Sequence, residues 1–537
     1  MSAQRKYPLG VNKLHAGLLL LLLSLLLSGC PQPVDSPESA PPPAPAAPWL
    51  TPGYQRLTLS WEGVPGASAY EVWYSEGTET AGKQQWNGGI SETATVITGL
   101  NNGTPYYVWL KALNGAGVSG FGPPASGTPG LPNTRPSVIR GDARLALSWE
   151  TIPGAEAAVY EVWYSQGTET ATKQRWNGDI SGTATVITGL TNDAVYYVWI
   201  KAKVSGETSD FGEAVDGSPE APKPPPTTNF TYVPGGTLIG SSSFAMTVTI
   251  PTDPPGYTNA GASIPMRGVF VPGRQVRINS FFMAKYEVSY ELWYGVRTWA
   301  EGKGYNFQNK GIEGRIDSSN PLASAAGSPP SARKNHPVIS VSWRDVIVWC
   351  NAYSEMEGLE PVYRDGGGNR IKDSRNSNGT VCDGAVMDKT KSGYRLPTEA
   401  EREFAARGGD SGQPDWMYMY AGSDTADTVA WHHGNSAYQT KAVGTKAANR
   451  LGIHDLSGNV QEWCWDWMNW NVDVTAGTPE DGAAHNQLVE GKNAGNQKAF
   501  PGGGVGSSSA MSSPVYRWGY NPDYTDLSVG FRVVRKP

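Results

Sequence analysis

The segment GYRLPTEAEREFAARGG, residues 393–409, contains the clearest helix signal in the chain. Thr398 is followed three residues later by Glu401, which is the spacing of a capping box, where each side chain accepts a hydrogen bond from a backbone amide of the first turn. The residues after Glu401 continue the helix until Gly408 and Gly409 end it. The sequence therefore predicts a short helix that begins after Thr398.

A second helix signal precedes it in VIVWCNAYSEMEG, which starts at Val346. Val346, Trp349, Cys350 and Tyr353 recur at helical spacing, so one face of this helix is apolar. Gly358 is typical of a helix end. Strand-like runs surround both helices, and the mixture predicts a domain of the α+β class.

Several blocks of sequence carry a family signature. In chain order they are FTYVPGGTLIGS (230–241), KYEVSYELW (285–293), HPVISVSWRDVIVWCNAYSEMEGLEPVY (336–363), GYRLPTEAEREFAARGG (393–409), NRLGIHDLSGNVQEWCWDW (449–467) and GFRVVR (530–535). Together they resemble the formylglycine-generating, or sulfatase-modifying, family. The resemblance implies that residues 229–537 form an elaborated C-type lectin-like domain, with short sheets, two helices and much ordered loop.

The chemistry of that family depends on groups that this chain lacks. The resemblance implies two copper-binding cysteines after a Gly-Gly-Ser segment, and soft thiolates suit Cu(I). The matching positions here fall near Ser507 and Ser512, and no cysteine lies beyond Cys464. A related branch uses histidine-bound iron, but His432 and His433 are adjacent and the other histidines are scattered. We therefore predict no redox cofactor and no enzyme activity, with an oxidase or related metalloenzyme as the alternative.

A structural Ca²⁺ site is the one family feature that this chain retains in sequence. In the family, a segment like DLSGNVQEW binds Ca²⁺, and the resemblance maps the ligands onto Asp455, the carbonyls of Gly458 and Val460, and Glu462. Hard oxygen ligands at close spacing suit this ion. The alternative is a tight loop whose carboxylates cap backbone amides without metal. In both cases the role is to rigidify the loop.

The C-terminal window, residues 501–530, has an unusual composition. Of its 30 residues, 16 are Gly, Ser, Tyr or Trp, and it contains no Lys, no Glu and the single arginine Arg517. Large aromatic side chains among small adaptable ones are typical of a binding surface. The alternative is a flexible loop without a partner. The predicted ligand-binding residues are Gly506, Ser507, Ser508, Ser512, Ser513, Tyr516, Trp518, Gly519, Tyr520, Tyr524, Asp526, Leu527 and Ser528.

The form GG…R…P…GFR at the end of the chain also resembles the targets of diversity-generating retroelements, in particular variable lipoproteins of the treponemal type. Such retroelements rewrite adenines in the last coding stretch of a gene. An asparagine codon changed at its two adenines yields Gly, Ser and Tyr but never Lys or Glu, which fits the window. The resemblance implies a diversified face whose partner is an unknown protein or carbohydrate.

Two sequence repeats precede the domain. LSW (59–61), EVWYS (71–75), TATVITGL (93–100) and YYVW (106–109) recur at 147–149, 161–165, 183–190 and 196–199. Short alternating runs between Gly, Pro and Asn turns predict β-sandwiches at 49–130 and 131–218. They resemble fibronectin type III modules, with Trp61 and Trp149 in the core and tyrosine corners at Tyr106 and Tyr196. We expect spacers, and the alternative is that the modules themselves bind carbohydrate.

The N-terminal end predicts export and anchoring. Positive residues and an apolar run precede Leu27-Ser28-Gly29-Cys30, which resembles a bacterial lipobox. Residues 1–29 then form a signal peptide, and Cys30 carries lipid at the head of a Pro-rich tether, residues 30–48. The alternative is ordinary cleavage with an unmodified Cys30. A second Pro-rich linker is predicted at 219–228.

These observations combine into one prediction. The chain is a non-catalytic receptor or adhesin, lipid-anchored in the bacterial cell envelope with its domains on the outer surface; a structural envelope protein remains a further alternative. The net charge of −6 leaves no basic patch, so nucleic acid is not an expected partner. Besides Cys30 the chain has three cysteines, so at least one of the three stays unpaired within the chain.

Overall fold

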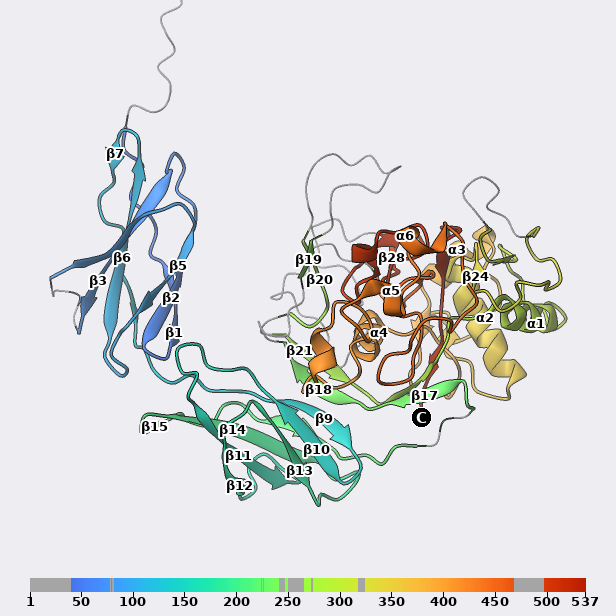
Figure 1. The fold of residues 1–537 in the computed structure, drawn as a ribbon, viewed down its shortest axis with the longest axis horizontal. Helices are drawn as coiled ribbons and strands as arrows, with labels where there is room; N and C mark the ends of the chain where they lie inside the picture. Colours follow the sequence, from blue (N-terminus) through green and yellow to red (C-terminus); the bar gives the residue numbers. More distant parts are fainter. Residues whose placement is uncertain are drawn as a thin grey trace, which may run out of the picture. The chain divides into compact units, whose positions relative to one another are not determined.

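The computed structural model describes residues 40–537 apart from 78, 80–81, 224, 226, 241–246, 250–264, 272–273, 317–323 and 468–496. The chain divides into two compact units, Met1–Leu131 and Pro132–Pro537, and each is treated by itself (Figure 1). The predicted signal peptide, Cys30 and most of the first tether lie outside the described residues. Within the described residues, no helix has the length and apolar character needed to cross a membrane.

The first unit contains module 1, a sandwich of two antiparallel sheets. One sheet consists of β1 (Trp49–Gly53), β2 (Arg56–Ser60) and β5 (Ala94–Thr98). The other consists of β4 (Gln84–Ile90), β3 (Ala69–Glu76), β6 (Tyr106–Asn114), β7 (Gly117–Val118) and β8 (Ala125–Gly127). Trp61 packs edge-on against Tyr70 between the sheets, with ring centroids 5.3 Å apart. The Asn101 amide donates to the Tyr106 hydroxyl over 3.0 Å, which confirms the predicted tyrosine corner.

Module 2 repeats this arrangement in the second unit. Its sheets contain β9 (Ser137–Gly141), β10 (Arg144–Ser148) and β13 (Ala184–Thr188), and β12 (Gln174–Ile180), β11 (Val159–Gln166), β14 (Tyr196–Val204), β15 (Glu207–Thr208) and β16 (Val215–Gly217). Trp149 and Tyr160 again pack edge-on at 5.3 Å. The Thr191 amide donates to the Tyr196 hydroxyl over 3.0 Å, so the second tyrosine corner is also confirmed.

One sheet of module 2 continues into the C-terminal domain, which the sequence did not predict. β9 pairs with β18 (Gly236–Ile239), and β18 pairs with β21 (Gln275–Ile278), giving the order β13-β10-β9-β18-β21. Gly236 lies opposite Ile139, and a Cβ atom on Gly236 would come within 2.5 Å of the Val138 carbonyl. Only glycine allows this approach. Module 2 is therefore joined to the domain by a shared sheet and is not a free spacer.

Side chains reinforce the shared sheet. The Ile239 amide donates to the Ser137 hydroxyl over 2.9 Å, and the Ser148 and Ser411 hydroxyls are hydrogen-bonded at 2.9 Å. Ile139 belongs to the same buried cluster as Leu238 and Phe281 of the domain. In the predicted linker, the Glu220 amide donates to the Gly141 carbonyl over 3.0 Å. The apolar core therefore runs across the junction.

The C-terminal domain mixes short sheets and helices, as its predicted class requires. Its longer helices are α1 (Tyr290–Glu301), α2 (Trp343–Met356) and α4 (Glu399–Ala406). Its shorter helices are α3 (Gly379–Asp383), α5 (Ala426–Val429), α6 (His433–Ser436), η1 (Asn376–Asn378), η2 (Pro414–Met417) and η3 (Ser509–Ser512). The remaining strands are β17 (Phe230–Val233), β19 (Thr247–Thr249), β20 (Pro265–Arg267), β22 (Phe281–Ala284), β23 (Ile312–Glu313), β24 (Val338–Ile339), β25 (Tyr363–Arg364), β26 (Val386–Met387), β27 (Gln461–Glu462), β28 (Lys498–Ala499), β29 (Gly519–Tyr520), β30 (Val529–Gly530) and β31 (Val534–Arg535).

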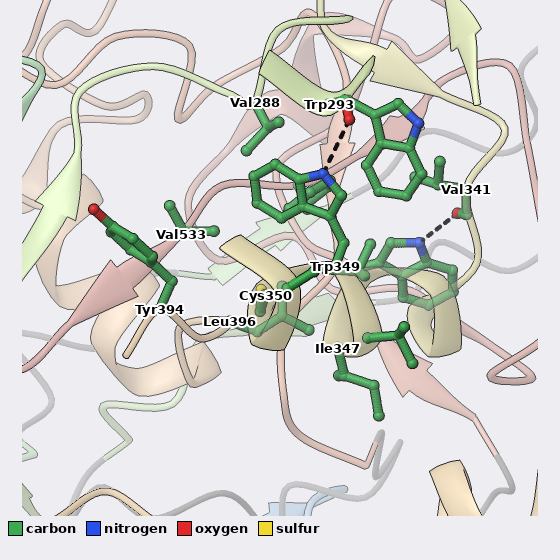
Figure 2. Close-up of a cluster of buried hydrophobic side chains, with 14 of the residues drawn as sticks. Val288, Trp293, Val341, Ile347, Trp349, Cys350, Tyr394, Leu396 and Val533 are labelled. Atoms are coloured by element: carbon green, nitrogen blue, oxygen red, sulfur yellow. Dashed lines mark hydrogen bonds between the residues drawn. The ribbon is translucent and has the colours of Figure 1, made fainter. Parts of the chain in front are cut away.

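An aromatic core holds α1 against α2 (Figure 2). Trp293 of α1 stacks on Trp349 of α2 with centroids 5.8 Å apart, and Trp349 Nε1 donates to the Trp293 carbonyl over 3.2 Å. Phe531 meets both rings edge-on. Large buried rings stabilise a core beyond their area when they meet in these geometries. The predicted apolar face of α2 is confirmed, although Asn351 and Ser354 on other faces are buried as well.

Helix α4 is buried on all sides although half of its residues are charged. The predicted capping box is confirmed, with Thr398 accepting from the Glu401 amide and Glu401 accepting from the Thr398 amide. Each charged side chain has a buried partner: Glu399 pairs with Arg517, Glu401 with Arg395, Arg402 with Glu462, and Glu403 with Arg407. Buried charges are tolerated only when paired in this way.

Candidate ligand-binding site

The C-terminal window is fixed to the scaffold at both ends. Gly502 and Gly503 begin it with φ of 104° and 63°, a region that favours glycine. A Cβ atom on Gly502 would overlap the Arg402 guanidinium, and one on Gly503 would lie 2.6 Å from the Met511 carbonyl. At the far end, β30 pairs in parallel with β27, and the following Phe531 is fully buried. The ends of the window are therefore rigid.

A buried ion pair fixes the middle of the window. Arg517 Nε and Nη2 donate to the two carboxylate oxygens of Glu399 over 2.8 and 2.6 Å. Both side chains are almost completely buried. A bidentate pair of this kind sets orientation as well as distance. The sequence singled out Arg517 as the lone arginine of the window but did not predict this role, because its partner lies 118 residues upstream.

Two aromatic rings of the window form a stack with Phe500, the residue just before it. Tyr520 and Tyr524 lie with ring centroids 4.0 Å apart, and Phe500 stacks on Tyr520 at 5.9 Å. Trp518 is nearly parallel to Tyr516 at 6.5 Å. Trp518, Tyr520 and Tyr524 are half-buried and pack against the main core, the buried cluster that contains Trp293, Trp349 and Phe531. Each of these three side chains is thus held by the core while part of its surface stays exposed.

The predicted contact residues divide by exposure. Half-exposed are Gly506, Ser507, Ser508, Trp518, Tyr520, Tyr524, Asp526, Leu527 and Ser528, and buried are Ser512, Ser513, Tyr516 and Gly519. Ser512 ends η3, Ser513 follows it directly, Tyr516 comes after these two, and Gly519 begins β29. These four expose little or no surface to a ligand in this structure, and their predicted contact with a ligand stays a prediction. They support the residues that do reach the surface.

Two of the half-exposed residues also have structural contacts. Asp526 accepts hydrogen bonds from the Ser528 amide over 2.7 Å and from the Tyr524 hydroxyl over 3.1 Å. Leu527 packs on a small cluster that includes Ile312 and Val460. Asp526 therefore organises the last turn of the window, and its carboxylate is not a free surface charge.

A polar group from distant loops lies beside the start of the window. The Arg315 guanidinium sits 5.4 Å over the Tyr438 ring and close to Gly506, where a Cβ atom would be 3.7 Å from its Nη1. The His433 amide donates to the Ser507 carbonyl over 2.9 Å, and its ring meets Tyr438 at 4.4 Å. Tyr438 has φ of 61°. Such strained conformations in non-glycine residues concentrate at functional sites. No sequence signal linked these residues to the window.

A buried lysine lies next to the aromatic stack. Lys498 Nζ on β28 is 3.7, 3.9 and 4.7 Å from the ring centroids of Trp467, Trp343 and Trp465, and donates to the Trp465 carbonyl over 3.0 Å. Burial lowers the pKa of Lys498 well below its usual value. β28 pairs with β29, so this side chain fixes the strand on which the window's Tyr520 lies.

The positions that match the family's copper ligands carry hydroxyls in a structural setting. The Ser507 hydroxyl accepts from the Gly504 amide over 3.1 Å, and Ser512 is fully buried. Within the described residues, Cys350, Cys382 and Cys464 form no disulfide; all three are buried, and burial raises the pKa of each thiol. In the described part of the chain, no group of three His, Cys, Asp or Glu side chains has an arrangement that could hold a metal ion.

The two carboxylates of the predicted Ca²⁺ site have different surroundings. Asp455 Oδ1 is buried and has no hydrogen-bond partner in the part of the chain that the structure describes, as an oxygen that awaits a cation would be, and burial raises the pKa of Asp455 to about 6. Glu462, however, accepts from Arg402 and Arg532 over 2.6 to 2.8 Å. Although burial opposes its ionisation, these guanidinium groups hold the pKa of Glu462 below its usual value. The donor set fits Ca²⁺ at Asp455 and not at Glu462, so calcium binding stays a prediction.

Known proteins resemble parts of the chain. The chaperone protein LppX of Paenibacillus barcinonensis is 33% identical over 213 residues, 36% of this chain and 65% of the relative. The formylglycine-generating enzyme of Thermomonospora curvata is 30% identical over 156 residues, covering 27% and 38%, and that of Bos taurus is 25% identical over 295 residues, covering 48% and 63%. The chain thus spans between 38% and 65% of the length of these relatives.

Solved structures are similar over a comparable share of the chain. CarF is 25% identical, covers 57% of this chain and 98% of its own, and has a TM-score of 0.40. Treponema denticola variable protein 1 is 24% identical, covers 58% and 100%, and has a TM-score of 0.38.

Family models cover both parts of the chain. The model of the fibronectin type III domain matches residues 50–128, which contain the strands of module 1. The model of the sulfatase-modifying factor enzyme 1-like domain matches residues 219–537, more than half of the chain. The chain belongs to the family of proteins with a sulfatase-modifying factor enzyme 1-like domain.

Proposed function

We propose that the chain is a non-catalytic, lipid-anchored protein displayed at the bacterial cell surface, and that the half-exposed side chains of the C-terminal window bind a protein or carbohydrate ligand. One observation carries this proposal. The window combines a backbone fixed at both ends and at Arg517 with half-exposed Trp518, Tyr520 and Tyr524.

Such a combination favours binding for a physical reason. Association costs free energy when loops and side chains must become ordered, so a surface that is ordered beforehand binds more tightly for the same contacts. Gly506, Ser507 and Ser508 add small, adaptable groups next to Arg315 and Tyr438. Because Glu399 and the main core hold the scaffold, exchange of exposed window residues should change ligand choice with little effect on stability.

The proposal that the chain is not an enzyme is supported by the same geometry. Hydroxyls at Ser507 and Ser512 do not replace soft thiolates as Cu(I) ligands, and the three buried thiols have raised pKa values. The purified chain should contain neither copper nor iron by elemental analysis and should consume no oxygen with a thiol substrate. Stoichiometric metal together with oxygen consumption would establish the oxidase alternative.

The binding face is tested by site-specific photo-crosslinking on the full chain in cells. A benzoylphenylalanine at position 520 should capture a partner, because Tyr520 is half-exposed in the window. The control places the same group at position 121, since Phe121 of module 1 is 39% exposed. Capture of the same partners from both positions, or from neither, contradicts a binding role for the window and favours a structural envelope protein.

The remaining parts of the proposal have separate tests. Labelling with a fatty-acid analogue should mark the wild-type chain and not Cys30→Ser, which would instead be released from the membrane fraction. Sequences of the gene's 3′ end from different isolates should differ mainly within residues 501–530. Uniform alleles without a nearby template repeat would remove the retroelement part and leave the binding proposal standing.

A further inference from the structure

A groove of about 860 Å³ lies in the second unit, away from the C-terminal window. Module 2 contributes Arg140 and Arg144, the segment after β16 contributes Glu220 and Lys223, and the C-terminal domain contributes Tyr232 and Lys285. The shared sheet fixes one wall, because the Arg140 amide donates to the Gly235 carbonyl over 3.0 Å. The groove therefore exists only because module 2 and the domain are joined.

Positive charge exceeds negative charge in this groove. Four cationic side chains face two carboxylates, those of Asp142 and Glu220. Asp142 accepts from the Asn192 amide group over 2.8 Å, and Glu220 accepts from the Ser280 hydroxyl over 2.7 Å and lies 3.5 Å from Lys223 Nζ.

The other three cations form no ion pair among the described residues. In the ranges that the structure describes, no ion pair joins Arg140, Arg144 or Lys285 to an acidic side chain. Arg140 Nε is buried and meets no hydrogen-bond acceptor among the described residues. Three cations outside any such ion pair, in one concave site with more cations than carboxylates, raise the local concentration of anions, and this occurs in a chain whose net charge is −6.

Module 1 shows that this charge is not a general feature of the sandwich. Arg144 corresponds to Arg56 in the repeat, but Arg140 corresponds to Pro52. Module 1 thus has one of the two arginines and no adjoining domain strand at this edge in the described part of its unit. Arg56 is therefore a natural control for Arg144 and its neighbours.

We propose that this groove binds an acidic oligosaccharide. The cations would pair with its carboxylate or sulfate groups. Asp142, Glu220 and the Thr231 hydroxyl would accept hydrogen bonds from sugar hydroxyls, which a ligand with anionic groups alone could not supply. Tyr232 and the exposed Pro222 and Pro225 offer flat apolar surface for the sugar rings. This site is separate from the window and independent of the window's proposed ligand.

The experiment uses the full chain in detergent and isothermal titration with trigalacturonic acid and a heparin-derived hexasaccharide. At least one acid should bind saturably and more weakly at higher salt, because the groups involved are exposed or half-exposed. The methyl ester of trigalacturonic acid should not bind. Arg140→Gln combined with Lys285→Gln should weaken binding on the order of tenfold or more, whereas Arg56→Gln and Trp518→Ala should leave it unchanged.

Each contrary result overturns the proposal. It fails if neither acid binds saturably, if the ester binds as well as the acid, or if the double variant keeps wild-type affinity. Tighter binding of hexa-aspartate than of either sugar would assign the groove to acidic peptides instead. Arg140→Gln keeps the amide that bonds to Gly235, and thermal unfolding checks that the double variant is folded. Lys285→Gln alone, outside the shared sheet, should still weaken binding severalfold.

Discussion

The two β-sandwich modules share most of their sequence and differ at one edge. In module 1 the edge strand β1 contains Pro52, and in module 2 the corresponding residue of β9 is Arg140. Proline has no amide hydrogen to donate and is confined to sheet edges. The Arg140 amide donates to Gly235 and joins the module to the domain. The residue at this one position therefore distinguishes the two strands. With Pro52, β1 stays at the edge of its sheet, whereas with Arg140, β9 pairs with a further strand.

The most severe test of this comparison exchanges the two residues. Arg140→Pro removes the bond to Gly235 and leaves a buried carbonyl without a partner. With the loss of neighbouring sheet bonds, we expect the free energy of unfolding of the second unit to fall by roughly 4 kcal/mol. The reverse change, Pro52→Arg, should alter the first unit by less than about 0.5 kcal/mol. Urea unfolding of each variant measures both effects, and equal losses would show that the edge pairing is unimportant.

The two units differ in the carboxylates that they bury, so their free energies of unfolding should depend differently on pH. Burial raises the pKa of Asp455 to about 6 and that of Glu287 well above its usual value, whereas the described part of module 1 buries no carboxylate. The folded state then holds a proton that the unfolded chain, with a pKa of about 4, releases. The protonated Asp455 contributes about 3 kcal/mol to the free energy of unfolding of the second unit. This contribution is complete below about pH 4 and is lost as the pH rises through 6.

The matching variant is Asp455→Asn, measured by urea unfolding at pH 4.5 and 7.5. It should flatten the pH dependence of the second unit, stabilise it at pH 7.5 and leave the first unit unchanged. If Ca²⁺ binds Asp455, the ion should instead stabilise the wild-type chain at pH 7.5, and the variant should lose that gain. An unchanged pH slope in the variant rules out Asp455 as its source.

The close approach of β18 to β9 gives a smaller expected effect. Gly236→Ala places a Cβ atom 2.5 Å from the Val138 carbonyl and 2.8 Å from Ile139 Cδ1, so the strands must separate. We expect a loss of about 2 kcal/mol in the second unit. Gly120→Ala in module 1, which meets no atom within 4 Å, serves as the control and should be neutral by calorimetry. Tolerance of both changes would indicate that the sheet is not continuous.

The smallest effect is expected at the first residue of the edge strand. Ser137→Ala removes the acceptor of the Ile239 amide and should cost about 1 kcal/mol. Its counterpart in module 1 is Trp49, which is 56% exposed, so Trp49→Ala should change stability by less than about 0.5 kcal/mol. Thermal unfolding compares the two, and a larger loss for Trp49→Ala would mean that β1 has a partner of its own.

Features encoded within a few residues were predictable from the sequence. The capping box of Thr398 and Glu401 and the corners at Tyr106 and Tyr196 depend on contacts three and five positions apart, and the structure confirms them. The domain class followed from ordered sequence blocks, and the family model agrees with it. Such signals are local, and tertiary packing did not override them.

Contacts between distant segments were not predictable. The pairing of β9 with β18 joins strands about a hundred residues apart, and the Arg517–Glu399 pair spans 118. Composition identified the C-terminal window but could not tell which side of its turn faces inward, so Tyr516 and Ser512 were taken as surface residues although both are buried. The difference between Pro52 and Arg140 was visible, but its meaning required the partner strand.

The shared sheet also limits how such a protein can be rearranged by recombination. A new module inserted before module 1 leaves every strand with the neighbours it already has. An insertion between module 2 and the C-terminal domain would separate β9 from β18 and expose the backbone groups of both strands. Tandem duplication can therefore lengthen the N-terminal part of the chain, while module 2 must be inherited together with the domain it adjoins.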